Sequence, residues 1–155
     1  MSEQQQPQFG IEKIYLKDLS LEIPNAPQIF LERETPQIEI NVHNGASPLG
    51  QPGLYEAVLT VTVTAKLKDK TAFLVEVAQA GIFRIVNLPP QELDAVLGVL
   101  CPGTLLPYAR EAVASVMTRA GFPPVILQHM SFDAAYQERM HQLQQEQAAK
   151  AGVPG

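Results

Sequence analysis

Two long stretches in which apolar and polar residues alternate restrict the possible folds of this chain more than any other feature. They span residues 55–67 and 71–85, and a short polar turn, Lys68-Asp69-Lys70, separates them. Apolar side chains at every second position are typical of a strand with one buried face, and such a turn joins antiparallel strands. We therefore expect two paired strands whose odd-numbered residues face the core. Leu74 and Glu76 would then lie beside each other on the open face.

Two further strands are predicted before this pair. Most apolar residues of 9–23 have odd numbers, and residues 38–42 again alternate between apolar and polar. Prolines in residues 24–36 predict an ordered crossover loop between these strands, because proline fixes φ and removes a ladder donor. The core face of the first strand would carry Phe9, Ile11, Tyr15, Leu19, Leu21 and Ile23.

Acidic residues mark the other face of the first strand. Asp18 and Glu22 both have even numbers, and only Ile14 and Leu16 interrupt this face near its start. Strand residues four positions apart project in the same direction, about 13 Å from each other. Asp18 and Glu22 are therefore predicted to form a short acidic row on the open face.

A change to helical patterns follows residue 87. We expect a short helix from Pro89-Pro90-Gln91-Glu92 through Leu100, which Cys101-Pro102-Gly103 would break. Pro107 would begin a longer helix, because the first helical position does not need its N–H. That helix would end near Ala120, with Gly121 as its left-handed cap.

Two features of the helical part concern packing. The longer helix has small or apolar residues on nearly every side, so we expect the sheet to cover one side and a neighbouring subunit another. A last helix, capped by Ser131, carries an apolar stripe at helical spacing. The stripe consists of Phe132, Tyr136, Met140 and Leu143.

Strands followed by helices predict an α+β fold, a four-stranded antiparallel sheet with helices packed on one face. The 155 residues suit one domain. We expect this domain to span residues 9–143, between flexible tails at residues 1–8 and 144–155.

Composition argues against several partners. The net charge is −5 and the 11 basic residues are scattered, so nucleic acid is not expected as a partner. There is no apolar run of roughly 20 residues for a membrane span and no signal-peptide pattern at the start. Cys101 is the only cysteine and cannot form an intramolecular disulfide. These observations favour a cytoplasmic protein.

Catalysis is not supported by any motif. His43, His129 and His141 have no metal-ligand spacing, and Cys101 has no neighbouring histidine to activate it. No phosphate loop or dinucleotide motif occurs. The sequence therefore predicts no enzyme, no metal and no cofactor.

Short motifs, in a shared order and spacing, resemble those of the SecB family of protein-export chaperones. They run from about Phe9 to Tyr136, nearly the whole predicted domain. The motifs are Ile14-Tyr15, Lys17-Asp18, Ser20, Pro24-Asn25-Ala26-Pro27, Tyr55-Glu56, Val61-Thr62-Val63-Thr64-Ala65, Thr71-Ala72-Phe73-Leu74, Glu76-Val77, Gly81-Ile82-Phe83, Cys101-Pro102, Pro107-Tyr108-Ala109-Arg110-Glu111, Gly121-Phe122-Pro123 and Phe132-Asp133-Ala134.

The resemblance implies an ATP-independent holdase in the cytoplasm, which keeps precursor proteins unfolded and delivers them to the SecA motor for export. It also implies a homotetramer, a dimer of dimers. The SecA-binding positions of the family match Asp18, Glu22, Leu74 and Glu76 here, and SecA presents a basic, zinc-binding C-terminal tail to that surface.

Two further sets of residues follow from the resemblance. Clients would bind a groove between the crossover loop, the second strand and the last helix, with Ile38, Ile40, Val42, Phe132, Tyr136 and Met140. The dimer–dimer interface would include Tyr108, Ala109, Ala112, Val113 and Val116. The family often has a tryptophan before the proline that precedes the second strand, but Glu34-Thr35-Pro36 stands here. This difference bears on client preference.

Two other functions are compatible with the residues. The same fold could stabilise one dedicated partner, such as an antitoxin, instead of many precursors; a client screen or the gene neighbourhood would separate these readings. The chain could also be a small-molecule binding or enzymatic α+β domain. Saturable binding of a metabolite without any chaperone effect would favour that alternative.

Overall fold

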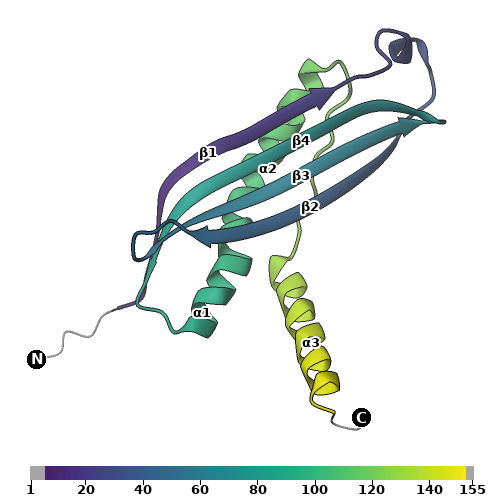
Figure 1. Ribbon diagram of the computed structural model, residues 1–155. Helices are drawn as coiled ribbons and strands as arrows, with labels where there is room; N and C mark the ends of the chain where they lie inside the picture. Colours follow the sequence, from purple (N-terminus) through teal and green to yellow (C-terminus); the bar gives the residue numbers. More distant parts are fainter. Residues whose placement is uncertain (1–5, 153–155) are drawn as a thin grey trace, which may run out of the picture.

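Four strands are followed by helices in the structure, a computed structural model that describes residues 6–152 (Figure 1). The strands are β1 (Gln8–Glu22), β2 (Gln37–Pro48), β3 (Leu54–Leu67) and β4 (Lys70–Val86). They form one sheet in the order β1-β4-β3-β2, and all neighbours are antiparallel. The predicted α+β fold with a four-stranded antiparallel sheet is confirmed.

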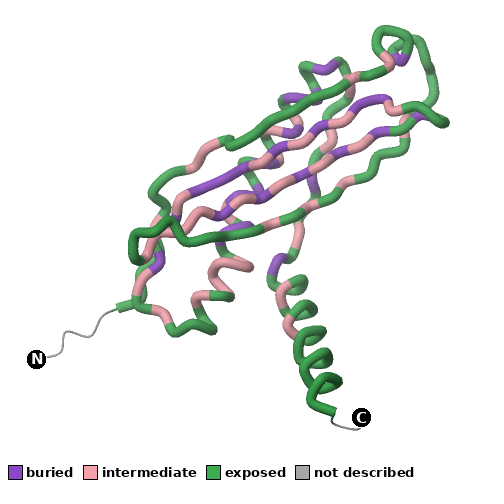
Figure 2. Tube along the Cα trace, in the orientation of Figure 1, coloured by how far each residue is buried: buried purple, intermediate pink, exposed green. Residues whose placement is uncertain are grey.

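The core lies between one face of the sheet and the helix α2 (Cys101–Arg119). Most odd-numbered residues of β3 and β4 are buried, and among them Val61 and Val77 are fully buried and lie opposite each other. In Figures 1 and 2, α2 runs behind β3 and β4, and buried residues concentrate on these three elements. Alternation in residues 55–85 therefore predicted the buried face correctly.

The helical part departs from the prediction between residues 90 and 107. Helix α1 (Pro90–Ala95) continues through a π-helical segment, η2 (Val96–Leu100), into α2. The predicted break at Cys101-Pro102-Gly103 is wrong, because Cys101 and Pro102 directly follow the π-helical segment and the helix continues through them into α2.

Pro107 lies inside α2 and does not begin it. A proline within a helix leaves the carbonyl four residues earlier, here that of Gly103, without its donor. Pro107 and Gly103 are both exposed, so water can bond that carbonyl. The predicted start of the longer helix at Pro107 is therefore wrong.

The end of α2 is as predicted. Gly121 has a φ of +88°, and its N–H donates to the carbonyl of Thr118 at 3.2 Å. The N–H of Phe122 donates to the carbonyl of Met117 at 3.1 Å. This pair of hydrogen bonds is a Schellman motif, which requires a residue in the left-handed region at the position of Gly121.

An aromatic stack holds the crossover loop against the end of α2. The loop contains a 3-10 turn, η1 (Gln28–Leu31). The ring of Phe30 lies 5.1 Å from that of Phe122, centroid to centroid, and Phe122 lies 4.7 Å from Phe73 of β4. This contact fixes the position of the crossover loop, residues 24–36, which its prolines predicted to be ordered.

The last helix, α3 (Phe132–Lys150), projects away from the sheet (Figure 1). The hydroxyl of Ser131 accepts from the N–H of Ala134 at 3.1 Å and caps it as predicted. Phe132 is its only buried residue within the described range. The helix continues past Leu143 to Lys150, and β1 begins at Gln8. The rest of the predicted tails, residues 1–5 and 153–155, lies outside the described residues, and tail flexibility stays a prediction.

Candidate functional site

Strand β1 contains two β-bulges. Glu12 and Lys17 have no partner in β4, so each is one extra residue in β1. Because strand side chains alternate between faces, each bulge exchanges the faces of the odd and even residues. Even-numbered residues therefore face the helices between the bulges, and odd-numbered residues do so before and after them.

The segment between the bulges explains the irregular sequence pattern there. Ile14 and Leu16 lie opposite Gly81 and Gln79, on the helix side of the sheet. Tyr15 was predicted to face the core but lies on the open face. This prediction is wrong because the bulge at Glu12 shifts the alternation, and a bulge depends on the partner strand.

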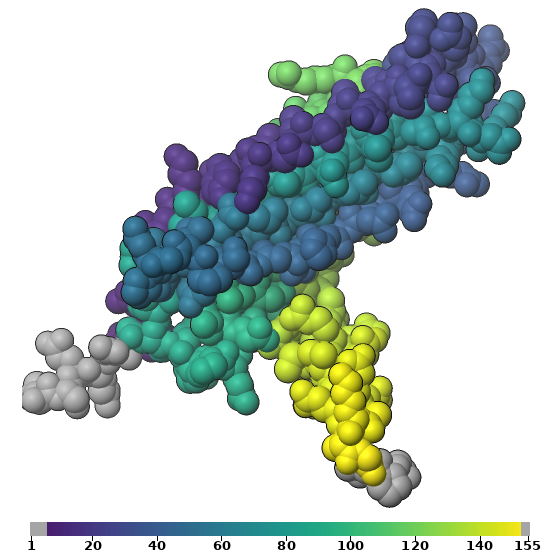
Figure 3. All heavy atoms as spheres, viewed as in Figure 1, coloured from purple at the N-terminus to yellow at the C-terminus, as the bar shows by residue number. Residues whose placement is uncertain are grey.

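Beyond the second bulge, the residues predicted to bind SecA come together. Ser20 lies opposite Glu76 and Glu22 opposite Leu74, so Asp18, Glu22, Leu74 and Glu76 share the open face of two paired strands. We call these four residues the acidic surface. Asp18 and Glu22 are exposed, whereas Leu74 and Glu76 are half-buried. Figure 3 views the sheet from this side, and no helix covers it.

Hydrogen bonds fix the charges near the acidic surface. Glu56 of β3 accepts from Lys17 Nζ at 2.8 Å and from the hydroxyl of Tyr15. The hydrogen bond from Lys17, and after it the weaker effect of the bond from Tyr15, lowers the pKa of Glu56. Burial, and then the bond to Glu56, raises the pKa of Tyr15 to about 12.

The acidic surface itself takes part in no ion pair of the described residues. The three ion pairs within residues 6–152 are Lys17–Glu56, Lys68–Glu34 and Arg84–Glu12. Glu76 accepts one hydrogen bond, from Thr62 Oγ1 at 3.2 Å. Because Lys17 is engaged by Glu56, the carboxylates of Asp18, Glu22 and Glu76 remain available to a cationic partner.

The residues predicted to form a client groove fall into two groups. Ile38, Ile40 and Val42 of β2 lie on the helix side of the sheet, opposite buried positions of β3. Ile38 is 44% exposed, and the other two are half-buried. The second group, Phe132, Tyr136 and Met140, lies on α3. The cavities between α3 and β2 are lined by Asn44, Gly98 and Arg139, among others, and not by Ile38, Ile40 or Val42.

Tyr136 packs α3 against the helical segment formed by α1 and η2. Its hydroxyl donates to Asp94 Oδ2 at 2.6 Å. This hydrogen bond is the main cause of a raised pKa of Tyr136, and burial is the second cause. Its ring lies against Gly98 of η2, where a Cβ would come within 2.9 Å of the ring. Asp94 and Gly98 were not predicted. A glycine within a helical pattern was the only signal that could have pointed to this contact.

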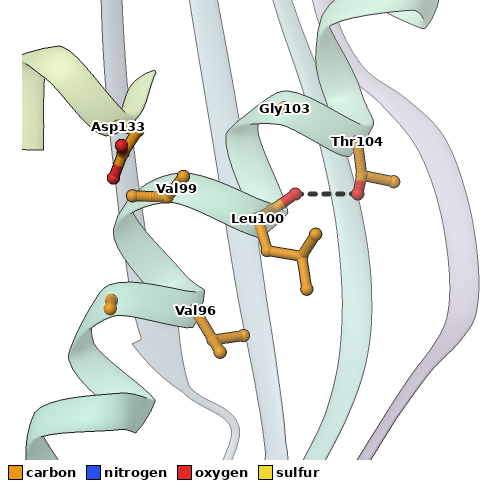
Figure 4. Close-up of a pocket in the computed structure, with 7 residues that line it drawn as sticks. Val96, Val99, Leu100, Gly103, Thr104 and Asp133 are labelled. Carbon is orange, nitrogen blue, oxygen red and sulfur yellow. Dashed lines mark hydrogen bonds between the residues drawn. The ribbon is translucent and has the colours of Figure 1, made fainter. Parts of the chain in front are cut away.

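An apolar cavity of about 500 Å³ lies where η2, α2 and the start of α3 meet (Figure 4). The hydroxyl of Thr104, at the cavity wall, donates to the carbonyl of Leu100 at 2.7 Å. Asp133 is the only ionisable residue that lines the cavity. One carboxylate cannot supply paired acid and base groups. The lining residues are Ala95, Val96, Val99, Leu100, Gly103, Thr104 and Asp133.

The predicted interface residues of α2 divide by exposure. Tyr108 is 48% exposed and Ala112 is half-buried, whereas Ala109, Val113 and Val116 are buried against the sheet within the subunit. The apolar character of this helix therefore arises largely from its own core. Tyr108 and Ala112 are the members of the predicted set with side-chain surface to offer a second subunit.

The groups weighed for catalysis or metal binding form no centre. Cys101 is fully buried, and burial raises the pKa of its thiol to about 12. Within residues 6–152, no three His, Cys, Asp or Glu side chains gather in a way that could hold a metal ion. No helix in the same range has the length and apolar character needed to cross a membrane.

Comparison with known proteins gives a consistent result. Residues 2–143 match the family described as "Preprotein translocase subunit SecB". The chain is 56% identical to the protein-export protein SecB of Dechloromonas aromatica over 99% of both chains. It is also 56% identical to that of Methylobacillus flagellatus, over 98% of this chain and 94% of the other.

A solved structure shares the fold. It is the SecB-like chaperone of Mycobacterium tuberculosis in complex with a peptide from the HigA1 antitoxin. The TM-score is 0.59 at 20% identity, over 79% of this chain and 88% of the other. The names of these proteins describe export proteins and chaperones and not enzymes. This preprotein-export chaperone chain belongs to the SecB family.

Proposed function

We propose that the chain is an ATP-independent holdase that binds unfolded precursor proteins in the cytoplasm and delivers them to SecA. The observation that carries this proposal is the acidic surface. It places three carboxylates and Leu74 together on an uncovered sheet face, in a chain of an export-chaperone family.

The chemistry of the acidic surface supports SecA as its partner. A basic peptide is the natural complement of carboxylates that make no ion pair in the described residues, because opposite charges steer encounter and fix the register of docking. Leu74, half-buried opposite Glu22 and beside Glu76, adds an apolar contact next to the charges. Salt should weaken such binding, because it screens exposed charges.

Apolar side chains on the helix side of the sheet and on α3 support client binding. Ile38 is exposed and Met140 is half-buried. Burial of apolar surface is non-directional and contributes about 25 cal/mol per Å², so it suits clients of unrelated sequence. Binding the unfolded state shifts the client's folding equilibrium by mass action. This step needs no nucleotide.

Exposed apolar residues also support the proposed homotetramer, a dimer of dimers. On the helix side of β1, Ile11 and Leu19 are 49% and 44% exposed, and Tyr108 is exposed on α2. Repeating a client groove over several subunits makes each further contact intramolecular. Avidity can then exceed the affinity of one site by roughly 10²–10⁴.

Dilution of a denatured precursor into buffer without nucleotide tests the holdase function. Light scattering and regained precursor activity are followed with and without the chain. We expect delayed folding and suppressed aggregation at near-stoichiometric amounts of tetramer. No effect on several unrelated precursors would remove the general holdase function and favour one dedicated partner.

Reversing one charge tests the SecA site. Glu76→Lys should weaken SecA binding at least about tenfold, because it places a cation among the remaining carboxylates, and should leave client holding unchanged. Glu146→Lys makes the same charge change on exposed α3 and should leave SecA affinity as it was. Calorimetry with purified SecA measures both. Equal losses in the two variants would contradict the site and indicate a general effect of net charge.

A further inference from the structure

Gln79 is the only buried polar side chain within the described residues, at 5% exposure. It lies on the helix side of β4, between Leu16 of β1 and Leu59 of β3. A buried amide among leucines costs free energy unless it is hydrogen-bonded. Gln79 meets this requirement by donating from Nε2 to the backbone carbonyl of Tyr15 at 3.0 Å.

This hydrogen bond lies at the second bulge of β1. Leu16 is the last residue in register before the bulge, opposite Gln79 itself, and Lys17 is the extra residue. A bulge disrupts the ladder locally and leaves backbone groups to find other partners. The Gln79 amide supplies a donor for one of them, from the helix side of the sheet.

A second anchor holds the same bulge from the open side. Glu56 accepts from the hydroxyl of Tyr15 and from Nζ of Lys17. Tyr15 is thus bound through its backbone by Gln79 and through its side chain by Glu56, and the extra residue, Lys17, shares the Glu56 carboxylate. The two anchors fix where the additional residue of β1 is accommodated.

The position of this bulge decides the face of the acidic residues. With the bulge, Ser20 lies opposite Glu76, and Asp18 and Glu22 lie on the open face. If the ladder continued past Leu16 without it, Leu19 would lie opposite Glu76 and every later side chain would change face. Asp18 and Glu22 would then point toward the helices, and Leu19 toward the open face.

We propose that Gln79 is a positioning residue for the acidic surface: by holding the second bulge, its amide keeps Asp18 and Glu22 on the face with Leu74 and Glu76. Gln79 touches no partner in this role. The role in binding rests on the proposed SecA function, but the effect on register does not.

Two pairs of introduced cysteines measure the register. Ser20→Cys with Glu76→Cys joins residues that are opposite in the structure, whereas Leu19→Cys with Glu76→Cys joins residues opposite only after the slip. In the parent chain, mild oxidation should cross-link the first pair and not the second. With Gln79→Leu, which keeps the size but removes the donor, the second pair should cross-link and the first should lose most of its yield.

Deletion of Lys17 provides the matched background. Without the extra residue, Leu16 and Asp18 become consecutive and keep their partners in an unbulged ladder, so the Gln79 bond is no longer needed to hold the register. Gln79→Leu should therefore leave the first cross-link unchanged in this background. A merely structural role for Gln79 in the core would make the substitution equally harmful in both backgrounds.

SecA affinity, measured on the same variants without introduced cysteines, completes the test. Gln79→Leu should lower it about tenfold or more in the full-length strand and not after deletion of Lys17. Retention of the first cross-link by Gln79→Leu would overturn the proposal, as would equal harm in both backgrounds, including failure to fold in both. A slipped register with unchanged SecA affinity would leave the positioning role standing and reject the SecA site instead.

Discussion

At the scale of single residues, the open face of the sheet carries both a carboxylate held in an ion pair and carboxylates that make none in the described residues. Glu56 is held by Lys17 and Tyr15, whereas Asp18, Glu22 and Glu76 make no ion pair within residues 6–152. The pairing of Glu56 stabilises the bulged segment of β1. The carboxylates of Asp18 and Glu22 on β1 and of Glu76 on β4 stay free for a cationic partner, although they lie on the same face of the sheet as Glu56.

This division predicts a pH dependence for Glu56. The bonds from Lys17 and Tyr15 lower its pKa, so its contribution to stability is complete above the pKa of the unfolded chain and is lost as the pH falls through the lower folded value. Glu56→Gln should lower the free energy of unfolding by about 1 kcal/mol at pH 7, and the difference should shrink below about pH 4. Urea unfolding at both pH values measures it.

Glu39→Gln is the control for that experiment, because Glu39 is an exposed residue of β2 with no ion pair in the described range. Its effect should be small at both pH values. A loss for Glu56→Gln that is the same at pH 7 and in acid would contradict the assignment, because it would then not depend on the charge of Glu56.

At the scale of elements, α3 depends on a small area of contact with η2. Tyr136 lies against Gly98 and bonds Asp94, and beyond Phe132 the described side chains of α3 are half-buried or exposed. π-Helical segments often occur at functional sites. Here η2 contains Gly98, which the ring of Tyr136 contacts. η2 therefore positions α3, which contributes half of the proposed client groove.

Gly98→Ala should therefore loosen α3, because the added methyl group would lie 2.9 Å from the Tyr136 ring. Gly103→Ala is the matched control, since a Cβ there meets nothing within 4 Å and both changes favour helix by up to about 1 kcal/mol. Limited trypsin digestion at Arg139 should be several-fold faster for Gly98→Ala than for the parent, and unchanged for Gly103→Ala. Equal rates in all three chains would show that Gly98 does not hold α3.

The elements also show what local sequence can and cannot predict. Alternation identified the buried faces of β3 and β4, and Gly121 marked the end of α2, because both signals act within a few residues. The bulges of β1, the unbroken course from α1 to α2 and the Tyr136–Gly98 contact depend on partners distant in sequence or on solvent exposure. The acidic surface could be predicted because two bulges restore the original alternation, so Asp18 and Glu22 lie on the face that an unbulged strand would give them.

At the scale of the whole molecule, apolar surface is concentrated along one edge of the sheet. β1 is an edge strand, and α2 packs mainly on β3 and β4, so most helix-side residues of β1 stay exposed. Its exposed apolar residues are Phe9, Ile11, Leu16, Leu19 and Leu21. Such a row favours association, because covering it removes apolar area from water.

Leu19→Lys should therefore shift the chain toward smaller assemblies. Static light scattering of the parent should give about four times the chain mass of 16.9 kDa, and the variant should give less at equal concentration. Leu49→Lys alters a side chain of similar exposure in the loop after β2, 42% against 44%, and should leave the mass unchanged. A parent that stays monomeric at micromolar concentration would contradict the proposed tetramer.

The strand order β1-β4-β3-β2 has a consequence for synthesis on the ribosome. β2, β3 and β4 pair with their neighbours in the chain, but β1 is made first and must wait for β4. Contacts between distant segments form later than local ones, so we expect the nascent chain to build its three-stranded meander first and add β1 last. Because the acidic surface is divided between β1 and β4, it forms only in that final step. A partly synthesised copy would therefore lack the proposed SecA site until its chain is complete through β4.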